Sequence, residues 1–410
     1  MNGYVPRLAD TRIRDLLTEL PAILITGPRA TGKTTTARRF AKSVVRLDRE
    51  AEAAAFRADP DIALRGLDEP ILLDEWQEVP AVLGAVKRAV DDEPRPGRFL
   101  LTGSVRADLE NQTWPGTGRL VRVNMQGLCV RESEQLEGAL FLERVLAADA
   151  SALQPAGDEN LSTYVQWALR GGFPEPALRL SEGGRRAWLE SYVDQLITRD
   201  AAGIGERRDP DRLRRYLQAI CLNSAGVVAG STIFESAGVD RKTANAYERL
   251  LTNLLVLEAV PAWHSNRLSR LIKMPKRYMA DTSLIGAIAG FSAESVMRDG
   301  DVLGRLLDNF VFTQLRVEAN VLESLPRIYH LRDKEGRHEI DLLIEYGGGQ
   351  VVALKVKASA APGGSDARHL TWLRDELGDR FVAGVVLHTG PRTFALGDRV
   401  FAAPISTLWG

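Results

Sequence analysis

The feature that most constrains the fold is an apolar run followed by a glycine-bounded loop. Residues 22–26 are apolar and predict a buried strand, residues 27–34 read G-P-R-A-T-G-K-T, and residues 35–40 are typical of a helix start. This order is that of a phosphate-binding P-loop. Its glycines allow backbone angles that point N–H groups at phosphate oxygens, and the helix presents its positive end to the same anion. The flanking strand and helix disfavour the alternative, a chance match in a loop.

The residue types in this loop predict a nucleoside triphosphate with Mg²⁺ as the bound ligand. Lys33 is expected to reach the β- and γ-phosphates, and the Thr34 hydroxyl is expected to bind Mg²⁺. The residues expected to contact the nucleotide form one continuous stretch: Gly27, Pro28, Arg29, Ala30, Thr31, Gly32, Lys33, Thr34 and Thr35.

A second apolar run ends in two acids that suit the same site. Residues 70–75 read P-I-L-L-D-E, which is typical of a buried parallel strand whose carboxyl end meets a phosphate site. Asp74 is expected to hold Mg²⁺ through water, and Glu75 is expected to act as general base toward the attacking water. An ordinary strand end with solvated acids is the alternative, and the preceding P-loop disfavours it.

Two further candidates follow, and the sequence leaves the role of each open. Residues 98–104 predict a third buried strand that ends in small hydroxyl residues, and either Thr102 or Ser104 suits contact with the γ-phosphate and water. A turn cap fits them equally well. Arg119 lies between a glycine turn and a predicted strand, where it either reaches a γ-phosphate, its own or that of a neighbouring subunit, or is a surface arginine. A neighbouring subunit would imply a homo-oligomer.

The order of predicted elements divides the chain into three parts. Strands and helices alternate over the first ~130 residues, which predicts an α/β domain with a parallel sheet. We place a P-loop domain at 1–155, a helical and winged-helix domain at 156–290, and a smaller α/β domain at 291–410. The 410 residues are enough for two or three such cores.

The middle part has the pattern of a winged helix. Residues 231–237 and 241–251 predict two helices around a glycine turn, and residues 254–260 and 276–281 predict the two strands of a wing. The second helix would present Arg241, Lys242, Asn245 and Arg249 to DNA phosphates or base edges. The wing would carry His264, Asn266, Arg267, Arg270 and Lys273. A helical lid or protein-docking module with a solvated basic face is the alternative.

The last part predicts the element order of a PD-(D/E)xK nuclease. A helix at 303–319 precedes three strands at 328–332, 339–345 and 351–359, and a helix at 370–377 and a strand at 381–387 close the unit. Active members of that class use two or three acids for Mg²⁺ and a lysine for the water. Here Asp341 and Lys357 fit, but Lys355 puts positive charge where the metal would sit, and only Asp308 remains as a second acid. We therefore expect a degenerate nuclease fold used for structure or binding; an active nuclease is the alternative.

Composition limits the remaining possibilities. The net charge is −1, so any binding to nucleic acid must come from a local basic patch. The two cysteines fit a reducing compartment, the start lacks a signal-peptide pattern, and no apolar run approaches the ~20 residues of a membrane span. We expect a cytoplasmic protein that does not contact a membrane.

With these residues in view, the chain resembles the prokaryotic AAA-type ATPases that join a P-loop domain to a carboxyl-terminal domain of unknown function similar to restriction endonucleases. The resemblance rests on segments spread over nearly the whole length: 27–34, 72–75, 101–104, 118–119, 171–175, 199–200, 276–281, 308–311, 339–341, 357–359 and 404–409. It implies binding and hydrolysis of ATP, with Arg119 in a Gly-Arg pair that serves as an arginine finger. Many members have glutamate at the position of Asp308 and an acid at that of Lys355, so nuclease activity is not expected here.

These observations favour a Mg²⁺-dependent ATPase that works as a switch or motor, coupled to DNA or to a protein partner. A nucleic-acid-binding regulator, whose nucleotide state gates DNA contact and whose nuclease-like domain is inactive, is the alternative. A protein-docking regulator with slow turnover is a further one. The preference for ATP over GTP rests on the resemblance, since no base-specifying motif is visible.

Overall fold

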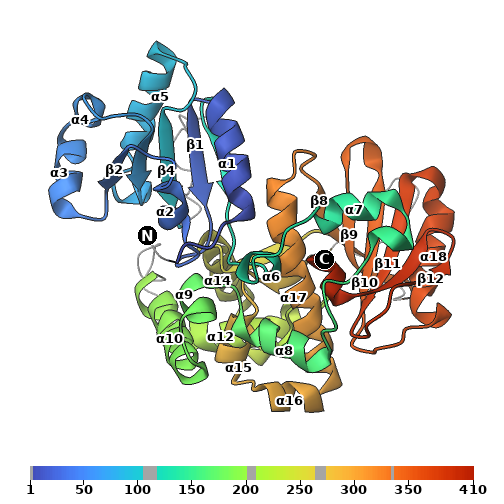
Figure 1. The fold of residues 1–410 in the computed structure, drawn as a ribbon. Coiled ribbons are helices and arrows are strands. Elements are labelled where there is room, and N and C mark those ends of the chain that lie inside the picture. The colour runs from blue at the N-terminus through green and yellow to red at the C-terminus, as the bar shows by residue number, and fades with distance from the viewer. Residues whose placement is uncertain (1–2, 105–117, 201–208, 264–273, 334–336) are drawn as a thin grey trace. The chain divides into compact units, whose positions relative to one another are not determined.

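The computed structural model describes residues 3–104, 118–200, 209–263, 274–333 and 337–410 (Figure 1). The chain forms two compact units, one of Met1–Gly127 with Leu251–Val256 and one of Leu128–Leu250 with Leu257–Gly410. None of the described helices is long and apolar enough to cross a membrane.

The first unit is built on a five-stranded parallel sheet, which confirms the predicted α/β layer. The strand order is β2-β3-β4-β1-β5, and every neighbouring pair is parallel. The strands are β1 (Ala22–Thr26), β2 (Ser43–Arg46), β3 (Ile71–Asp74), β4 (Phe99–Gly103) and β5 (Val121–Asn124). Because β1 lies between β4 and β5, the loop that follows it opens at the carboxyl edge of the sheet interior, where α/β sheets bind ligands.

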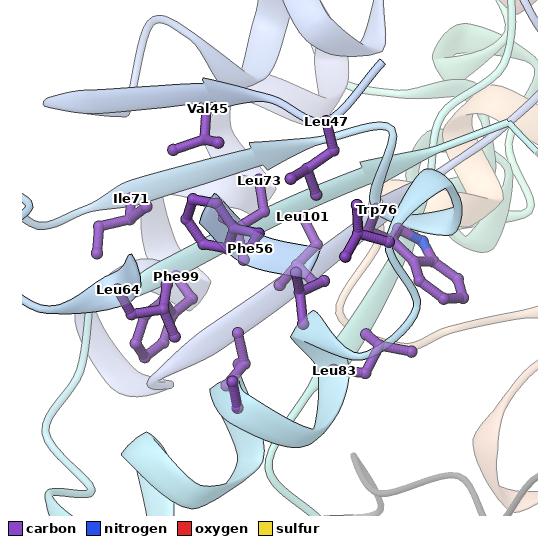
Figure 2. Close-up of a cluster of buried hydrophobic side chains, with 14 of the residues drawn as sticks. Val45, Leu47, Phe56, Leu64, Ile71, Leu73, Trp76, Leu83, Phe99 and Leu101 are labelled. Atoms are coloured by element: carbon purple, nitrogen blue, oxygen red, sulfur yellow. The ribbon is translucent and has the colours of Figure 1, made fainter. Parts of the chain in front are cut away.

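Helices cover both faces of this sheet. Figure 2 shows the core of one face, where Leu73 and Leu101 from the strands meet Phe56 and Leu64 from the helices. The helices on this face are α3 (Glu50–Ala58), α4 (Pro60–Leu64) and α5 (Val82–Asp92), and α1 (Leu8–Glu19) and α2 (Lys33–Ala37) pack against β1 outside this cluster. Burying one leucine fully stabilises the fold by about 1.5–3 kcal/mol. Because helices cover both faces of the sheet, polar side chains reach solvent at the ends of its strands.

The second unit begins with a helical part. Its helices are α6 (Val130–Ser133), α7 (Phe141–Arg144), α8 (Leu161–Arg170), α9 (Pro174–Leu178), α10 (Glu182–Gln195), α12 (Pro210–Leu222), α13 (Gly230–Ser236), α14 (Arg241–Asn253), α15 (Ser283–Ala289) and α16 (Ala293–Arg298). The predicted long helix at 185–200 is regular only to Gln195, and Leu196–Asp200 continues as a π-helix.

The helix–turn–helix order and the two strands predicted after it are present. The turn between α13 and α14 contains Gly238 with φ 64°, and β6 (Leu257–Val260) pairs antiparallel with β7 (Lys276–Met279). Beyond β6, Trp263 N–H donates to the His330 carbonyl over 2.8 Å, and His330 N–H donates to the Pro261 carbonyl over 3.1 Å. The segment that follows β6, toward the connection to β7, is therefore joined to β8 of the second sheet, and the winged-helix assignment remains a prediction.

The second sheet has six strands in the order β12-β13-β11-β10-β9-β8 (Figure 1, orange to red). Its elements in chain order are α17 (Gly300–Val321), β8 (Arg327–Arg332), β9 (Glu339–Glu345), β10 (Val351–Val356), α18 (Gly364–Leu377), β11 (Phe381–His388), β12 (Phe394–Gly397) and β13 (Val400–Pro404). Strand β9 is antiparallel to both of its neighbours, β8 and β10, whereas β10, β11 and β13 are parallel. The elements predicted from residue 303 to residue 387 are present in the predicted order, as α17, β8, β9, β10, α18 and β11.

The expectation that residues 381–387 close this unit is wrong. Strand β13 pairs in parallel with β11 and is buried at all five positions, and β12 forms the edge beyond it. The run V-F-A-A-P is short and ends in proline, so its local pattern resembles a loop. Its burial comes from its place between β11 and β12 in the sheet and from packing against α18.

Candidate nucleotide-binding site

The predicted P-loop connects β1 to α2, and its glycines are required by the backbone. A Cβ atom on Gly27 would lie 1.9 Å from the Met125 carbonyl oxygen, and Gly32 has φ 93°. Both positions therefore exclude a side chain, one by close approach and the other by conformation. Helix α2 has only five residues, so a phosphate in this loop would depend mainly on the N–H groups of the loop and on Lys33.

The Lys33 side chain is buried at the centre of this loop. Its ammonium group donates to the Pro28 carbonyl oxygen over 2.7 Å, and the same oxygen accepts from the Thr31 hydroxyl over 2.9 Å. Burial lowers the pKa of Lys33 to about 8, while the nearby Glu75 and Asp74 carboxylates act in the opposite direction. A triphosphate bound in the loop would place a negatively charged partner beside this ammonium group.

Asp74 lies at the end of β3, where three segments bring oxygen atoms together. Its Oδ1 accepts from the Thr34 hydroxyl over 2.7 Å and also from the Thr102 hydroxyl at the end of β4. The carboxylate is buried, and its Oδ2 is 3.9 Å from Nε of Arg46 on β2. Carboxylate and hydroxyl oxygens are the ligands that Mg²⁺ prefers, so Thr34 and Asp74 fit a shared magnesium ion.

Glu75 has a strained backbone next to this acid. Its φ of 55° and ψ of 52° are in the left-handed region, which a glutamate adopts rarely. The backbone N–H donates to the Thr102 hydroxyl over 3.3 Å, and the carboxylate accepts from the Ser104 hydroxyl over 3.2 Å and from the Gln77 amide. Strain that the surroundings maintain is typical of functional positions.

The two hydroxyl residues that the sequence left undecided occupy different places. Thr102 contacts Asp74, the expected magnesium ligand, whereas Ser104 contacts the carboxylate of Glu75, the expected base. Both side chains are buried at the site rather than capping an exposed turn.

Three site residues were missed by the sequence analysis. Arg7 donates to the Thr31 carbonyl in the P-loop over 2.9 Å and to the carbonyls of Gln126 and Gly127 over 2.7 and 3.0 Å, so it connects the loop to the segment after β5. Arg46 and Gln77, described above, face the two acids. No local pattern singles out these residues, because each reaches the site through the packing of the unit.

The position of Arg119 excludes one of its predicted roles. In the parallel register Val121 aligns with Ile23 and Asn124 with Thr26, so Arg119, before β5, lies at the opposite edge of the sheet from the P-loop. There it forms an ion pair with Asp91 over 2.7 Å. The expectation that it reaches a γ-phosphate bound to its own P-loop is wrong, because the length of the sheet separates them. A role in a neighbouring subunit remains a prediction.

The residues predicted to contact DNA share one face of α14. Arg241, Lys242, Asn245 and Arg249 are exposed, whereas Ala244, Tyr247 and Leu250 face the interior. On the adjacent β7, Arg277 is not available in the same way, because it pairs with Glu248 over 2.9 Å. The predicted wing residues 264–273 lie outside the described part of the chain.

The predicted nuclease-like residues are only partly brought together. Asp308 of α17, Asp341 of β9 and Lys355 of β10 form one cluster, and Lys276 of β7, which the prediction missed, joins it. Lys357 follows the end of β10 and pairs instead with Asp366 of α18 over 3.0 Å. Its predicted place beside Asp341 is therefore wrong.

The first unit, with its sheet and strand-end site, is an AAA-type P-loop NTPase domain: residues 19–134 match the family described as "AAA domain". Residues 161–295 match "Domain of unknown function (DUF8612)" and residues 303–408 match "Domain of unknown function (DUF4143)".

Two mycobacterial proteins are similar to the chain over nearly its whole length. They are "Uncharacterized protein Rv2008c" of Mycobacterium tuberculosis and "Uncharacterized protein Mb2031c" of Mycobacterium bovis, each 30% identical over 403 residues, which is 97% of this chain and 83% of the relative. The chain belongs to the family of these two proteins.

Two solved structures resemble parts of the chain more distantly. The Walker-type ATPase paby2304 of Pyrococcus abyssi aligns over 68% of this chain and 94% of its own, with 15% identity and a TM-score of 0.43. A RuvB variant of Thermotoga maritima aligns over 62% and 86%, with 20% identity and a TM-score of 0.28.

Proposed function

We propose that this protein is a Mg²⁺-dependent ATPase that acts as a nucleotide-driven switch or motor. The observation that carries the proposal is the convergence of the P-loop, Asp74 and Glu75 at one edge of the sheet. Lys33 and the loop N–H groups hold the phosphates, and Thr34 and Asp74 hold the metal. Bound Mg²⁺ would neutralise charge on the β- and γ-phosphates. Glu75 orients the attacking water and accepts its proton.

Steady-state phosphate release tests this proposal. We expect turnover of ATP in the presence of Mg²⁺ and its loss in EDTA, and GTP is compared in parallel because only the resemblance to AAA-type ATPases favours adenine. A protein that neither binds nor hydrolyses either nucleotide would sink the proposal.

We further propose that Arg119 acts in a neighbouring subunit. It is exposed at the edge of the sheet opposite the P-loop, where it pairs with Asp91 on a surface that a second copy of the chain can approach. Arg119→Ala is expected to lower ATP turnover by about 10³-fold, the lower end of the effect of an arginine finger. Arg95→Ala, an exposed arginine at the same edge, is the control and should be active.

A mixing experiment separates this role from a loss of folding. Arg119→Ala has an intact Glu75, and Glu75→Gln has an intact Arg119, so a mixed oligomer contains some complete sites. We expect the mixture of the two inactive variants to regain part of the wild-type turnover. A mixture that stays as inactive as its components contradicts the proposal.

A nucleic-acid-binding regulator is the second candidate function, because α14 exposes a run of basic and polar side chains. Arg241→Ala combined with Lys242→Ala is expected to weaken duplex DNA binding and to reduce the slope of log affinity against log salt by about 2. The matched control replaces two exposed arginines of the same unit, Arg179 and Arg186. Affinity that is absent at low salt, or unchanged in the variant, would remove this candidate.

The two candidates differ in how DNA affects hydrolysis. Stimulation of ATP turnover by single- or double-stranded DNA would connect the P-loop to α14 in one DNA-coupled ATPase. Turnover that ignores DNA would favour a switch regulated by a protein partner. In either case we propose that the carboxyl-terminal α/β part is a degenerate nuclease-like fold that serves structure or binding.

A further inference from the structure

Four charged side chains from four different elements meet inside the second unit. The Lys276 ammonium group, at the start of β7, is 2.7 Å from Asp308 Oδ2 on α17 and 3.5 Å from Asp341 Oδ1 on β9. The Lys355 ammonium group on β10 is 3.0 Å from the same Asp341 oxygen. Two positive and two negative charges therefore balance within one cluster.

Every carboxylate oxygen of this cluster has a donor from the chain itself. Asp308 Oδ1 accepts from the Tyr278 hydroxyl over 3.1 Å, and Asp308 Oδ2 accepts from Lys276. Asp341 Oδ1 accepts from Lys355, and Asp341 Oδ2 accepts from the Val356 backbone N–H over 2.9 Å. Each carboxylate oxygen of this pair therefore already has a hydrogen-bond donor within the protein.

The oxygen atoms around the Lys276 ammonium group resemble the ligands of a bound metal ion. The lysine side chain is 1% exposed, and its ammonium group lies among one oxygen from each carboxylate and the Asp341 carbonyl oxygen at 3.3 Å. Carboxylate and carbonyl oxygens are also the ligands of Mg²⁺ and Ca²⁺. A buried ammonium is costly unless it is paired, so these oxygens and this lysine depend on one another.

The protonation states agree with a fixed ammonium. Burial alone would lower the pKa of Lys276, but Asp308 and Asp341 prevail and raise it well above its ordinary value. Burial opposes ionisation of Asp341, yet Lys355 and Lys276 lower its pKa to about 2. The lysine and this aspartate are both charged near neutral pH.

We propose that the Lys276 ammonium is the resident cation of this site and takes the place of a divalent metal, joining β7 to α17 and β9 without a metal ion. Within the described residues, no group of three or more His, Cys, Asp or Glu side chains is arranged to hold a metal. Lys355 adds a second positive charge on the same carboxylate. This inference concerns the second unit and stands apart from the proposed ATPase activity.

Thermal unfolding of the full-length protein without nucleotide tests the proposal. Lys276→Ala removes the cation and leaves space beside two buried carboxylates. We expect the melting temperature in EDTA to fall by about 10 °C relative to the wild type, and millimolar Mn²⁺ to restore part of this loss in the variant only. Adding Asp341→Asn to Lys276→Ala should abolish the restoration by Mn²⁺.

Lys357→Ala is the matched control, because this lysine lies close in sequence but pairs with Asp366 outside the cluster. We expect no response of this variant to Mn²⁺ beyond that of the wild type. The proposal is overturned if Lys276→Ala melts like the wild type in EDTA, or if Mn²⁺ raises its melting temperature no more than it does for the wild type.

Mn²⁺ binding, followed by electron paramagnetic resonance, keeps the proposal testable if Lys276→Ala does not fold. The wild type and Lys355→Ala both retain Lys276. In neither protein should the addition of Asp341→Asn reduce the amount of bound Mn²⁺. Such a reduction in either protein would show that a metal, and not Lys276, is the natural cation of the site.

Discussion

Glu75→Gln is expected to bind ATP as the wild type does and to lower the turnover number by about 10²- to 10⁴-fold. The amide keeps the size of the side chain but cannot accept the proton of the attacking water, and this range is the usual contribution of a general base. Nucleotide affinity is measured by equilibrium titration, and turnover is measured by phosphate release under saturating ATP.

Glu78→Gln is the matched control for this substitution. Glu78 is exposed in the short 3₁₀-helix Trp76–Glu78 that directly follows Glu75, so its replacement tests the effect of losing a carboxylate nearby. We expect wild-type turnover for this control. Turnover of Glu75→Gln within a few-fold of the wild type would show that another group serves as the base and would remove the role proposed for Glu75.

Lys33→Ala is expected to lower kcat/KM for ATP by about 10²- to 10³-fold, the usual cost of removing one preorganised donor to transition-state charge. The pH dependence of the wild type gives a second test of the same residue. The pKa of Lys33 is lowered to about 8, so its ammonium is present below pH 8 and is lost as the pH rises above it. We therefore expect kcat/KM to fall up to tenfold per pH unit above about pH 8.

Lys33→Arg separates this titration from other effects of alkaline pH. A guanidinium group stays charged throughout the accessible range, so the residual activity of this variant should lack the break near pH 8. Lys42→Arg, an exposed lysine of the same unit, should keep the wild-type profile. A break that persists unchanged in Lys33→Arg would assign the titration to another group.

The surroundings of Glu75 fix the position of its backbone and its carboxylate. Its left-handed backbone follows directly after β3, and Thr102, Ser104 and Gln77 hold its N–H group and carboxylate in place. A base that is held this way loses little conformational freedom when substrate binds, which is how preorganised sites lower a barrier.

The sequence by itself determined the P-loop, most of the order of elements and the two acids at the end of β3. These features are local, because glycine positions, apolar runs and the residue at the end of a strand are set within a few neighbours in the chain. Parallel strands place their carboxyl ends at one edge, so Lys33, Thr34 and Asp74 were expected to meet, and the structure brings them together.

Only the tertiary structure decided where Arg119, Lys357 and Lys276 lie. The register of β5 places Arg119 at the edge of the sheet opposite the P-loop. Lys357 lies beyond the end of β10 and pairs with Asp366. Lys276 reached Asp308 and Asp341 from a strand that the sequence assigned to another domain. Local patterns fix which face of an element is apolar, but strand order and register fix which charges become neighbours, and these depend on packing over the whole unit.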